Sequence, residues 1–217
     1  MTRLLIEREA WIINEKYALS QEDLDILQEH PVKVAKDWSK KEYKPIRDRI
    51  RAHYFSIQNK TCSYCRLPIN EGTDNVEVEH IIDKNRRLDF IFETLNLVVS
   101  CHKCNFSKSK KEVMSVCPPE NTYPINGTTF NIIHGHYDNY FDHLEFLANS
   151  SYHALTDKGE FTIDKCKLDR VGLAEQRERI SMYENDSIIS DVLEIKNSVN
   201  PNEKIEALIE KLKQIRQ

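Results

Sequence analysis

Long apolar segments are missing from this 217-residue sequence. No hydrophobic run approaches the ~18 residues that a membrane-spanning helix requires, so such a helix is excluded. The first residues interrupt their apolar stretch with charge at once, which is not the pattern of a secretory signal peptide. We therefore expect a cytoplasmic protein without a membrane partner, in which the cysteines are kept reduced.

Glycine and proline are scarce as well, with 5 and 7 residues. Internal repeats and low-complexity linkers are absent, while 30% of the residues are charged and 40% are hydrophobic. This composition is typical of a folded globular protein and excludes a disordered or fibrous chain. The phosphate-binding motif G-x-x-x-x-G-K-[ST] is also missing, so any nucleotide-driven switch has to come from a partner.

The chain has no overall excess of positive charge, since its formal net charge is −4. The charges are unevenly distributed, however. Residues 32–60 carry 9 basic and 3 acidic side chains, whereas residues 113–217 carry 11 and 17. Phosphate binding requires a local basic patch and not a basic chain. Residues 33–51 therefore either face a nucleic acid or form ordinary solvated helix faces.

Two cysteine doublets, Cys62-x-x-Cys65 and Cys101-x-x-Cys104, stand out among the residues that carry chemistry. Four thiolates in two such pairs can close a tetrahedral zinc site. The metal would then tie together two distant segments of the chain. The alternative is two reactive or merely buried pairs. The remaining cysteines have no doublet partner and are expected to be ordinary buried thiols, namely Cys117 and Cys166.

A histidine, a carboxylate and two asparagines lie between and beside the doublets: Glu79, His80, Asn96 and Asn105. A purely structural zinc site needs none of them. A site that hydrolyses phosphodiesters, in contrast, needs a general base close to a metal ion. Histidine suits the role of the base because its ordinary pKa lies near neutrality. The alternative for a single histidine is a satisfied position in the core.

The order of these residues resembles the HNH, or His-Me finger, endonuclease family in its four-cysteine zinc form. The likeness lies in Cys-x-x-Cys, Glu-His-Ile-Ile-Asp-Lys and Asn-Leu-Val-Val-Ser-Cys-His-x-Cys-Asn, within residues 62–111. It implies structural Zn²⁺ on the four cysteines, His80 as the general base, and Glu79 with Asn105 as ligands of a catalytic Mg²⁺ or Mn²⁺. Asn96 would support the loop between the two strands. Relatives more often carry aspartate where this chain has Glu79.

The resemblance also implies a nucleic-acid partner, with DNA expected first and RNA second. Positive charge in and near the cysteine segment predicts contacts with phosphates, from Lys84, Arg86, Arg87, Lys108 and Lys111. The rival interpretation is a zinc-dependent module that binds nucleic acid or protein without catalysis. Such a module would have no use for Glu79, His80 and Asn105 together.

The second half shows a weaker likeness to the tail of HNH nucleases linked to Septu-type and retron-type phage defence. It rests on Phe130-Asn131, Asp138, residues 142–146, Gly159, Thr162-Ile163, residues 168–170 and Arg177. This likeness implies the nuclease of an anti-phage complex, with a regulatory ATPase or a second copy of the chain as partners. A second metal site is conceivable at His134, His136, Asp138 and His143, but their spacing matches no ligand motif and favours a structural role.

The fold class that follows is α+β: a zinc-stapled ββα-metal finger with N-terminal helices and a C-terminal β-hairpin plus helices. We divide the chain into a helical arm (1–45), a nuclease core (46–112) and a hairpin and helical region (113–217).

Helices are predicted at about 21–29, from Pro45 onward, and at 102–111, 171–184, 187–198 and 202–216. Strands are predicted at 76–82, 97–100, 128–134, 145–147, 151–155 and 160–163, the last two joined by a turn at Asp157-Lys158-Gly159. The apolar stripe Ile205, Leu208, Ile209, Leu212 and Ile215 either packs on the core or docks a partner.

Overall fold

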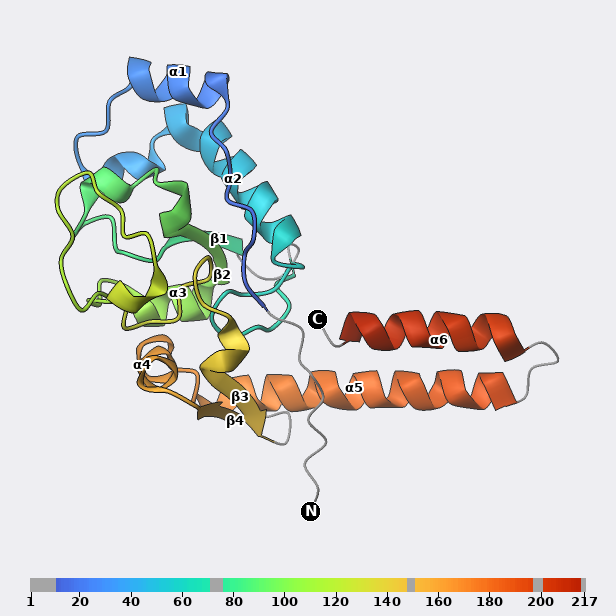
Figure 1. Cartoon of the computed structure of the whole chain (residues 1–217). Helices are drawn as coiled ribbons and strands as arrows, with labels where there is room; N and C mark the ends of the chain where they lie inside the picture. The colour runs from blue at the N-terminus through green and yellow to red at the C-terminus, as the bar shows by residue number, and fades with distance from the viewer. Residues whose placement is uncertain (1–10, 71–75, 148–150, 197–200, 216–217) are drawn as a thin grey trace.

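The protein is an α+β molecule, as expected, with two small antiparallel sheets and a projecting pair of helices (Figure 1). The computed structural model describes residues 11–70, 76–147, 151–196 and 201–215. Within these ranges no helix is long and apolar enough to cross a membrane.

Two helices cover one side of the body and begin where the sequence predicts them. Helix α1 (Gln21–Glu29) starts with a capping box in which Ser20 and Asp23 satisfy each other's backbone N–H groups. Helix α2 (Lys44–Ile57) has a proline in its first turn, where a missing N–H costs nothing. Its apolar face is buried and packs against both strands of the first sheet, through Ile46, Ile50, Tyr54 and Phe55.

The first sheet and the helix that follows it form a ββα unit. Strand β1 (Val76–His80) pairs antiparallel with β2 (Leu97–Cys101), so that His80 lies opposite Leu97. Helix α3 (His102–Lys108) starts directly after β2 and is shorter than predicted. Both predicted strands are confirmed, and β1 ends at His80 instead of continuing to residue 82.

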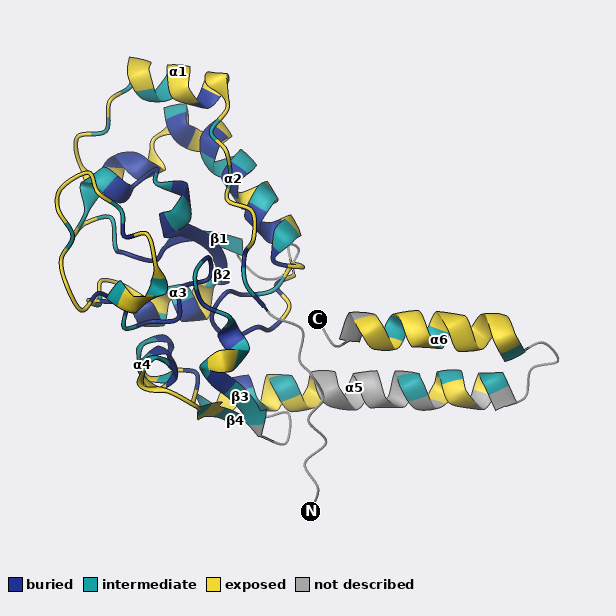
Figure 2. Ribbon diagram, viewed as in Figure 1, coloured by how far each residue is buried: buried dark blue, intermediate teal, exposed yellow. Residues whose placement is uncertain are grey.

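The N-terminal segment joins the second half of the chain to the same core. Residues 11–20 form no regular element, yet Trp11 and Ile13 are buried. The Ile13 N–H donates to the carbonyl of Gly135 at 2.8 Å, and the Tyr140 N–H donates to that of Trp11 at 3.0 Å. Because these bonds link residues more than 100 positions apart, they attach the N-terminal segment to the second half of the chain. Figure 2 shows buried residues gathered around β1, β2 and α2.

The strand predicted at 128–134 is not formed. In its place are a 3₁₀ turn (Gly127–Thr129) and a single bridge between Met114 and Phe130. The next residues close a turn of their own, because the Asp138 carboxylate accepts the His134 N–H at 2.8 Å and the Asp138 N–H donates to the His134 carbonyl at 2.9 Å. Backbone groups bonded within a turn are not available to a sheet.

The C-terminal β-hairpin is formed by an earlier pair of strands than the pair predicted. Strand β3 (Leu144–Leu147) pairs with β4 (Ser151–Ala154), and the segment predicted to be its last strand is helix α4 (Asp157–Cys166). The turn prediction at 157–159 is wrong because Thr156 caps a helix there: its side chain accepts the Gly159 N–H. Asp157 and Glu160 in the first turn add the negative charge that a helix N-terminus favours.

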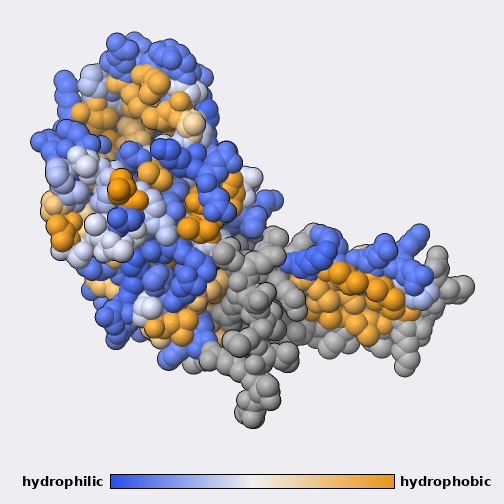
Figure 3. Space-filling view, viewed as in Figure 1, coloured by the Kyte–Doolittle hydropathy of each residue, from blue (hydrophilic) through white to orange (hydrophobic). Residues whose placement is uncertain are grey.

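The chain ends in a helical hairpin that extends from the body (Figure 1). Helix α5 (Val171–Lys196) is continuous where two helices were predicted, and α6 (Pro201–Ile215) packs along it. Ion pairs join the two helices, Lys204–Glu194 at 3.2 Å and Lys211–Asp191. Within the predicted stripe on α6, Leu208 is half-buried, whereas Ile205, Ile209 and Leu212 are exposed as an apolar strip (Figure 3).

Candidate metal and catalytic site

The four cysteines of the two doublets meet in one cluster. Cys62 and Cys65 lie in the turn after α2, Cys101 ends β2, and Cys104 is in α3. Their four sulfur atoms all lie within 4.8 Å of one another, which is compatible with one tetrahedral zinc ion. No other group of three or more histidine, cysteine or acidic side chains is arranged to hold a metal in the part of the chain that the structure describes.

Two arginines from the C-terminal region complete the surroundings of this cluster. Arg170 Nη2 lies 3.4 Å from the Cys104 sulfur, where a guanidinium favours the thiolate form that binds metal. Arg177, in the first half of α5, stacks over the Phe146 ring at 3.6 Å and donates to the Cys65 carbonyl. The hairpin β3–β4 and the start of α5 are thereby attached to the cluster.

The two remaining cysteines lie apart from the cluster. Cys166 is buried, as expected, whereas the prediction that Cys117 is buried is wrong, since it is exposed. The segment around Cys117 has no regular secondary structure, and its sulfur lies 3.9 Å from the Arg87 guanidinium and 3.7 Å from the Pro118 carbonyl.

His80 lies at the end of β1 with its ring almost completely buried, 3% of the residue being exposed. Its Nε2 is 3.0 Å from the carbonyl oxygen of Ile91. A carbonyl only accepts, so Nε2 carries the hydrogen and Nδ1 keeps a free lone pair. The Trp38 ring packs edge-on at 4.5 Å between centroids. Burial, with a contribution from Lys84, lowers the His80 pKa to about 3, so the ring is neutral at pH 7.

Asn96 holds the loop that carries the partner of His80. Its amide oxygen accepts the Ile82 N–H at 2.7 Å, and its amide nitrogen donates to the carbonyls of Ile82 at 3.0 Å and Phe90 at 3.2 Å. Phe90 is the neighbour of Ile91, whose carbonyl fixes the His80 ring. Asn96 is completely buried, so these bonds are not exchanged with water.

Glu79 is buried beside His80 and forms an ion pair with Lys108. The Lys108 ammonium lies 2.6 Å from Glu79 Oε1 and donates to the His80 carbonyl at 3.0 Å. The structure thus places Lys108 in the interior, 1% exposed, and not at the surface where a contact with phosphate was expected. Burial raises the pKa of Glu79, although the Lys108 charge opposes this rise. Tyr64 also contacts Oε1, at 3.5 Å, which leaves Oε2 for a cation.

Asn105 faces β1 from α3 and is oriented by Glu77. The Asn105 amide nitrogen donates to Glu77 Oε2 at 2.6 Å, and His102 Nδ1 lies 2.7 Å from Glu77 Oε1. Since a carboxylate only accepts, the amide oxygen of Asn105 points away from Glu77. Our sequence reasoning missed Glu77, although alternation along β1 places it on the same face as Glu79.

The predicted catalytic residues line one shallow hollow of about 280 Å³. Glu79 and His80 contribute from β1, Asn105 and Phe106 from α3, and Lys84 from the loop after β1. Neighbouring side chains on a strand point to opposite faces, so the convergence of Glu79 and His80 depends on β1 ending at His80. Carboxylate and amide oxygens are donors that suit a hard cation such as Mg²⁺, so the side chains present fit such an ion.

The other predicted phosphate contacts differ in how free they are. Lys84 is partly exposed in the hollow. Arg86 is half-exposed and already pairs with Glu112 at 2.8 Å. Lys111 donates to the Lys165 carbonyl at 3.3 Å. Arg87 is held within the protein, since it pairs with Asp89 at 2.6 Å and donates to the carbonyls of two prolines, Pro118 and Pro119.

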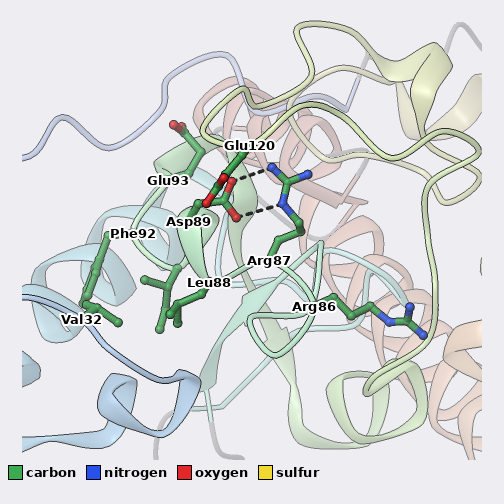
Figure 4. Close-up of a pocket in the computed structure, with 9 residues that line it drawn as sticks. Val32, Arg86, Arg87, Leu88, Asp89, Phe92, Glu93 and Glu120 are labelled. Carbon is green, nitrogen blue, oxygen red and sulfur yellow. Dashed lines mark hydrogen bonds and ion pairs between the residues drawn. The ribbon is translucent and has the colours of Figure 1, made fainter.

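A larger hollow of about 800 Å³ is lined by the segment that carries Arg87 (Figure 4). Its lining includes Val32, Phe92 and Glu93, and Figure 4 shows Arg87 turned toward Asp89 within it. Arg87 and Asp89 pair with each other there, and His80, Glu79 and Asn105 are not part of the lining. The smaller hollow is therefore the better candidate for chemistry.

Half of the basic side chains in the stretch 33–51 pair with neighbouring carboxylates. Arg49 pairs with the buried carboxylate of Asp23, and Lys40 pairs with Asp37 at 2.9 Å. Asp48 accepts from both Lys44 and Arg51. The interpretation as ordinary helix faces therefore fits this stretch better than a dedicated phosphate surface.

The histidines of the second half take part in packing. The His134 ring stacks on Tyr137 at 4.2 Å, and His136 Nε2 bonds to the Leu97 carbonyl at 2.9 Å. Asp138 pairs with Lys158 at 2.8 Å. Burial lowers the pKa of His136 to about 4, as expected for a neutral core histidine.

Comparison with known proteins gives one partial likeness. The chain is 33% identical over 67 residues to the Septu protein PtuB of Bacillus thuringiensis. The aligned part is 29% of this chain and 26% of that protein, so the chain covers about a quarter of the relative's length. No family model matches the chain. The comparison supports a relationship to Septu proteins through a limited segment.

Proposed function

We propose that this protein is a metal-dependent HNH endonuclease that hydrolyses phosphodiester bonds of DNA, with RNA as the second substrate class. We further infer that it is the nuclease of an anti-phage defence complex. The partial likeness to a Septu protein supports the second part. A regulatory ATPase partner, a second copy of the chain, or both would complete such a complex, since the sequence has no nucleotide-binding P-loop of its own.

One observation supports the proposal most directly. His80 lines a hollow together with side-chain oxygen atoms that can bind a cation, and its ring is held in one tautomer. The Ile91 carbonyl fixes hydrogen on Nε2, which leaves Nδ1 to accept a proton from an attacking water. Burial keeps the ring neutral, so Nδ1 retains its lone pair. Water reaches the base through the hollow that Lys84 and Asn105 also line.

Two metals have separate places in this proposal. Zn²⁺ on Cys62, Cys65, Cys101 and Cys104 is structural. Glu79 Oε2 and the Asn105 amide oxygen would hold Mg²⁺ or Mn²⁺. When bound, that cation would neutralise the scissile phosphate and the leaving oxygen. Glu77 keeps the Asn105 oxygen turned toward this position, and Lys108 keeps the Glu79 carboxylate in place.

The second candidate is a zinc-dependent binding module without catalysis. It is favoured by the burial of His80 and by the ion pair that Glu79 already forms. It gives no reason for a base with a free Nδ1 beside two oxygen donors, and we therefore rank it second.

The test is cleavage by a His80→Ala variant. Purified protein is incubated with plasmid DNA and with structured RNA, with and without Mg²⁺. We expect the wild type to cut and His80→Ala to lose at least about 100-fold in rate, the usual contribution of a general base. His30→Ala is the matched control, because His30 lies on the surface near α1, away from the hollow.

The zinc content of His80→Ala should stay close to that of the wild type, since His80 is no zinc ligand in this arrangement. Its melting temperature should fall, because removal of a buried ring leaves a cavity, so cleavage is compared at a temperature at which circular dichroism shows the variant folded. Cleavage by His80→Ala within a few-fold of the wild type would refute the base assignment. Wild-type protein that binds nucleic acid and never cleaves it would support the binding module instead.

A further inference from the structure

Phe106 is the one exposed aromatic side chain in the part of the chain whose side chains the structure describes. It is 76% exposed, while every other described phenylalanine, tyrosine and tryptophan is buried or half-buried. A single exposed apolar residue needs no explanation by itself. The position of Phe106 does need one, because Phe106 directly follows Asn105 and lines the same hollow as Glu79 and His80.

Charged side chains of both signs share the hollow with the ring, since Glu77, Glu79 and Asp83 line it as well as two lysines. Lys84 and Lys110 also line the hollow, and neither forms an ion pair with another described residue. The described ring nearest to Phe106 is His102, at 6.0 Å between centroids and tilted by 32°. Proteins bind single-stranded nucleic acid with aromatic rings that stack on bases and with cations that attract phosphates, and Phe106, Lys84 and Lys110 supply these groups in one hollow.

We propose that Phe106 stacks on an unpaired nucleobase next to the scissile phosphate, so that the preferred substrate has a single-stranded segment at the cut site. The inference rests on the proposed nuclease function and deepens it. Phe106 supplies the base contact, while Lys84 and Lys110, which line the same hollow, supply phosphate contacts.

The test measures binding in a His80→Ala background without added Mg²⁺, so that cleavage does not interfere. Fluorescence anisotropy is recorded with a labelled single-stranded oligonucleotide and with the same sequence as a duplex. We expect Phe106→Ala to weaken single-strand binding about 10-fold, as loss of one stacked base predicts. Phe106→Trp should retain binding, and Phe106→Leu should behave like Phe106→Ala because it keeps apolar area but loses the ring.

Phe106→Trp adds a direct readout. Trp11 and Trp38 are buried, so the exposed indole at position 106 should be the one that the oligonucleotide quenches. The zinc content and melting temperature of Phe106→Ala should be unchanged, because the side chain is exposed and contributes little to the core.

Each outcome separates the two levels of the proposal. If the parent binds no nucleic acid at all, the proposed function fails. If the parent binds and Phe106→Ala binds equally well, the stacking inference fails while the function stands. A loss that appears on the duplex and not on the single strand would also overturn the inference.

Discussion

The ion pair between Glu79 and Lys108 is the contact of the site that is hardest to predict from the sequence. The motif locates Glu79, His80 and Asn105 because their order and spacing are specific. The role of Lys108 depends on which face of the short helix α3 turns toward β1, and seven residues give too little periodicity to show it. The contact of Glu77 with Asn105 and the exposure of Phe106 could not be predicted for the same reason, although alternation along β1 places Glu77 on the same face as Glu79.

Removing one partner of this ion pair should destabilise the protein strongly. Lys108→Met leaves a buried carboxylate without a counter-ion, for which we expect a loss of about 3–5 kcal/mol in the free energy of unfolding. Denaturant unfolding measures it. Lys110→Met is the control, because Lys110 is exposed and should change stability by less than about 0.5 kcal/mol.

A double variant identifies the cause of this loss. Glu79→Gln removes the unpaired charge, so Glu79→Gln/Lys108→Met should recover part of the stability that Lys108→Met loses. If Lys108→Met unfolds at the same denaturant concentration as the wild type, the buried ion pair is not formed in solution.

At the scale of elements, local signals predict some boundaries and miss others. Ser20 and Pro45 mark the starts of α1 and α2 through capping and a fixed φ, and both helices begin there. The sequence around 185–187, Asn-Asp-Ser, favours a break, yet α5 continues through it. At the start of α4 the residues Thr156, Asp157 and Gly159 are compatible both with a β-turn and with the capped N-terminus of a helix. The sequence alone therefore does not distinguish the two.

Gly159 and Gly172 provide a matched pair in helices α4 and α5. A Cβ at Gly159 would lie 2.0 Å from the His143 carbonyl oxygen, so α4 could pack there only after a backbone shift. Gly159→Ala should therefore cost about 1–3 kcal/mol, the usual price of overpacking. A Cβ at Gly172 meets nothing within 4 Å, and Gly172→Ala should stabilise by about 0.5–1 kcal/mol through helix propensity.

Thermal unfolding of the two glycine variants reports opposite shifts if α4 and α5 have the described arrangement. A Gly159→Ala variant as stable as the wild type would mean that α4 does not approach His143 closely. Because both variants add the same methyl group to a helix, a change of opposite sign in their melting temperatures reports the difference in local packing.

At the scale of the whole molecule, the sequence predicts the α+β class and the ββα unit but not how the halves join. The bonds between residues 11–13 and 135–140 link segments whose separation leaves no local signature. The same holds for Arg170 and Arg177, which return from the second half to the cysteine cluster. The apolar stripe of α6 was correctly seen as helical, but its contact with α5 and its distance from the body follow only from the fold.

The zinc site connects these parts of the fold, so loss of the metal should lower the stability of the whole protein. The cluster joins the turn after α2, the end of β2 and helix α3, and through Arg170 the start of α5. We expect about one zinc ion per chain and its loss in Cys104→Ser. Since structural zinc contributes to folding, Cys104→Ser should lose roughly 5 kcal/mol and melt roughly 10–20 °C lower, with cleavage reduced in parallel. Cys117→Ser, an equal chemical change at an exposed thiol, should keep zinc and stability. Elemental analysis and calorimetry measure both quantities, and a zinc-free Cys104→Ser with the wild-type melting temperature would contradict the four-sulfur site.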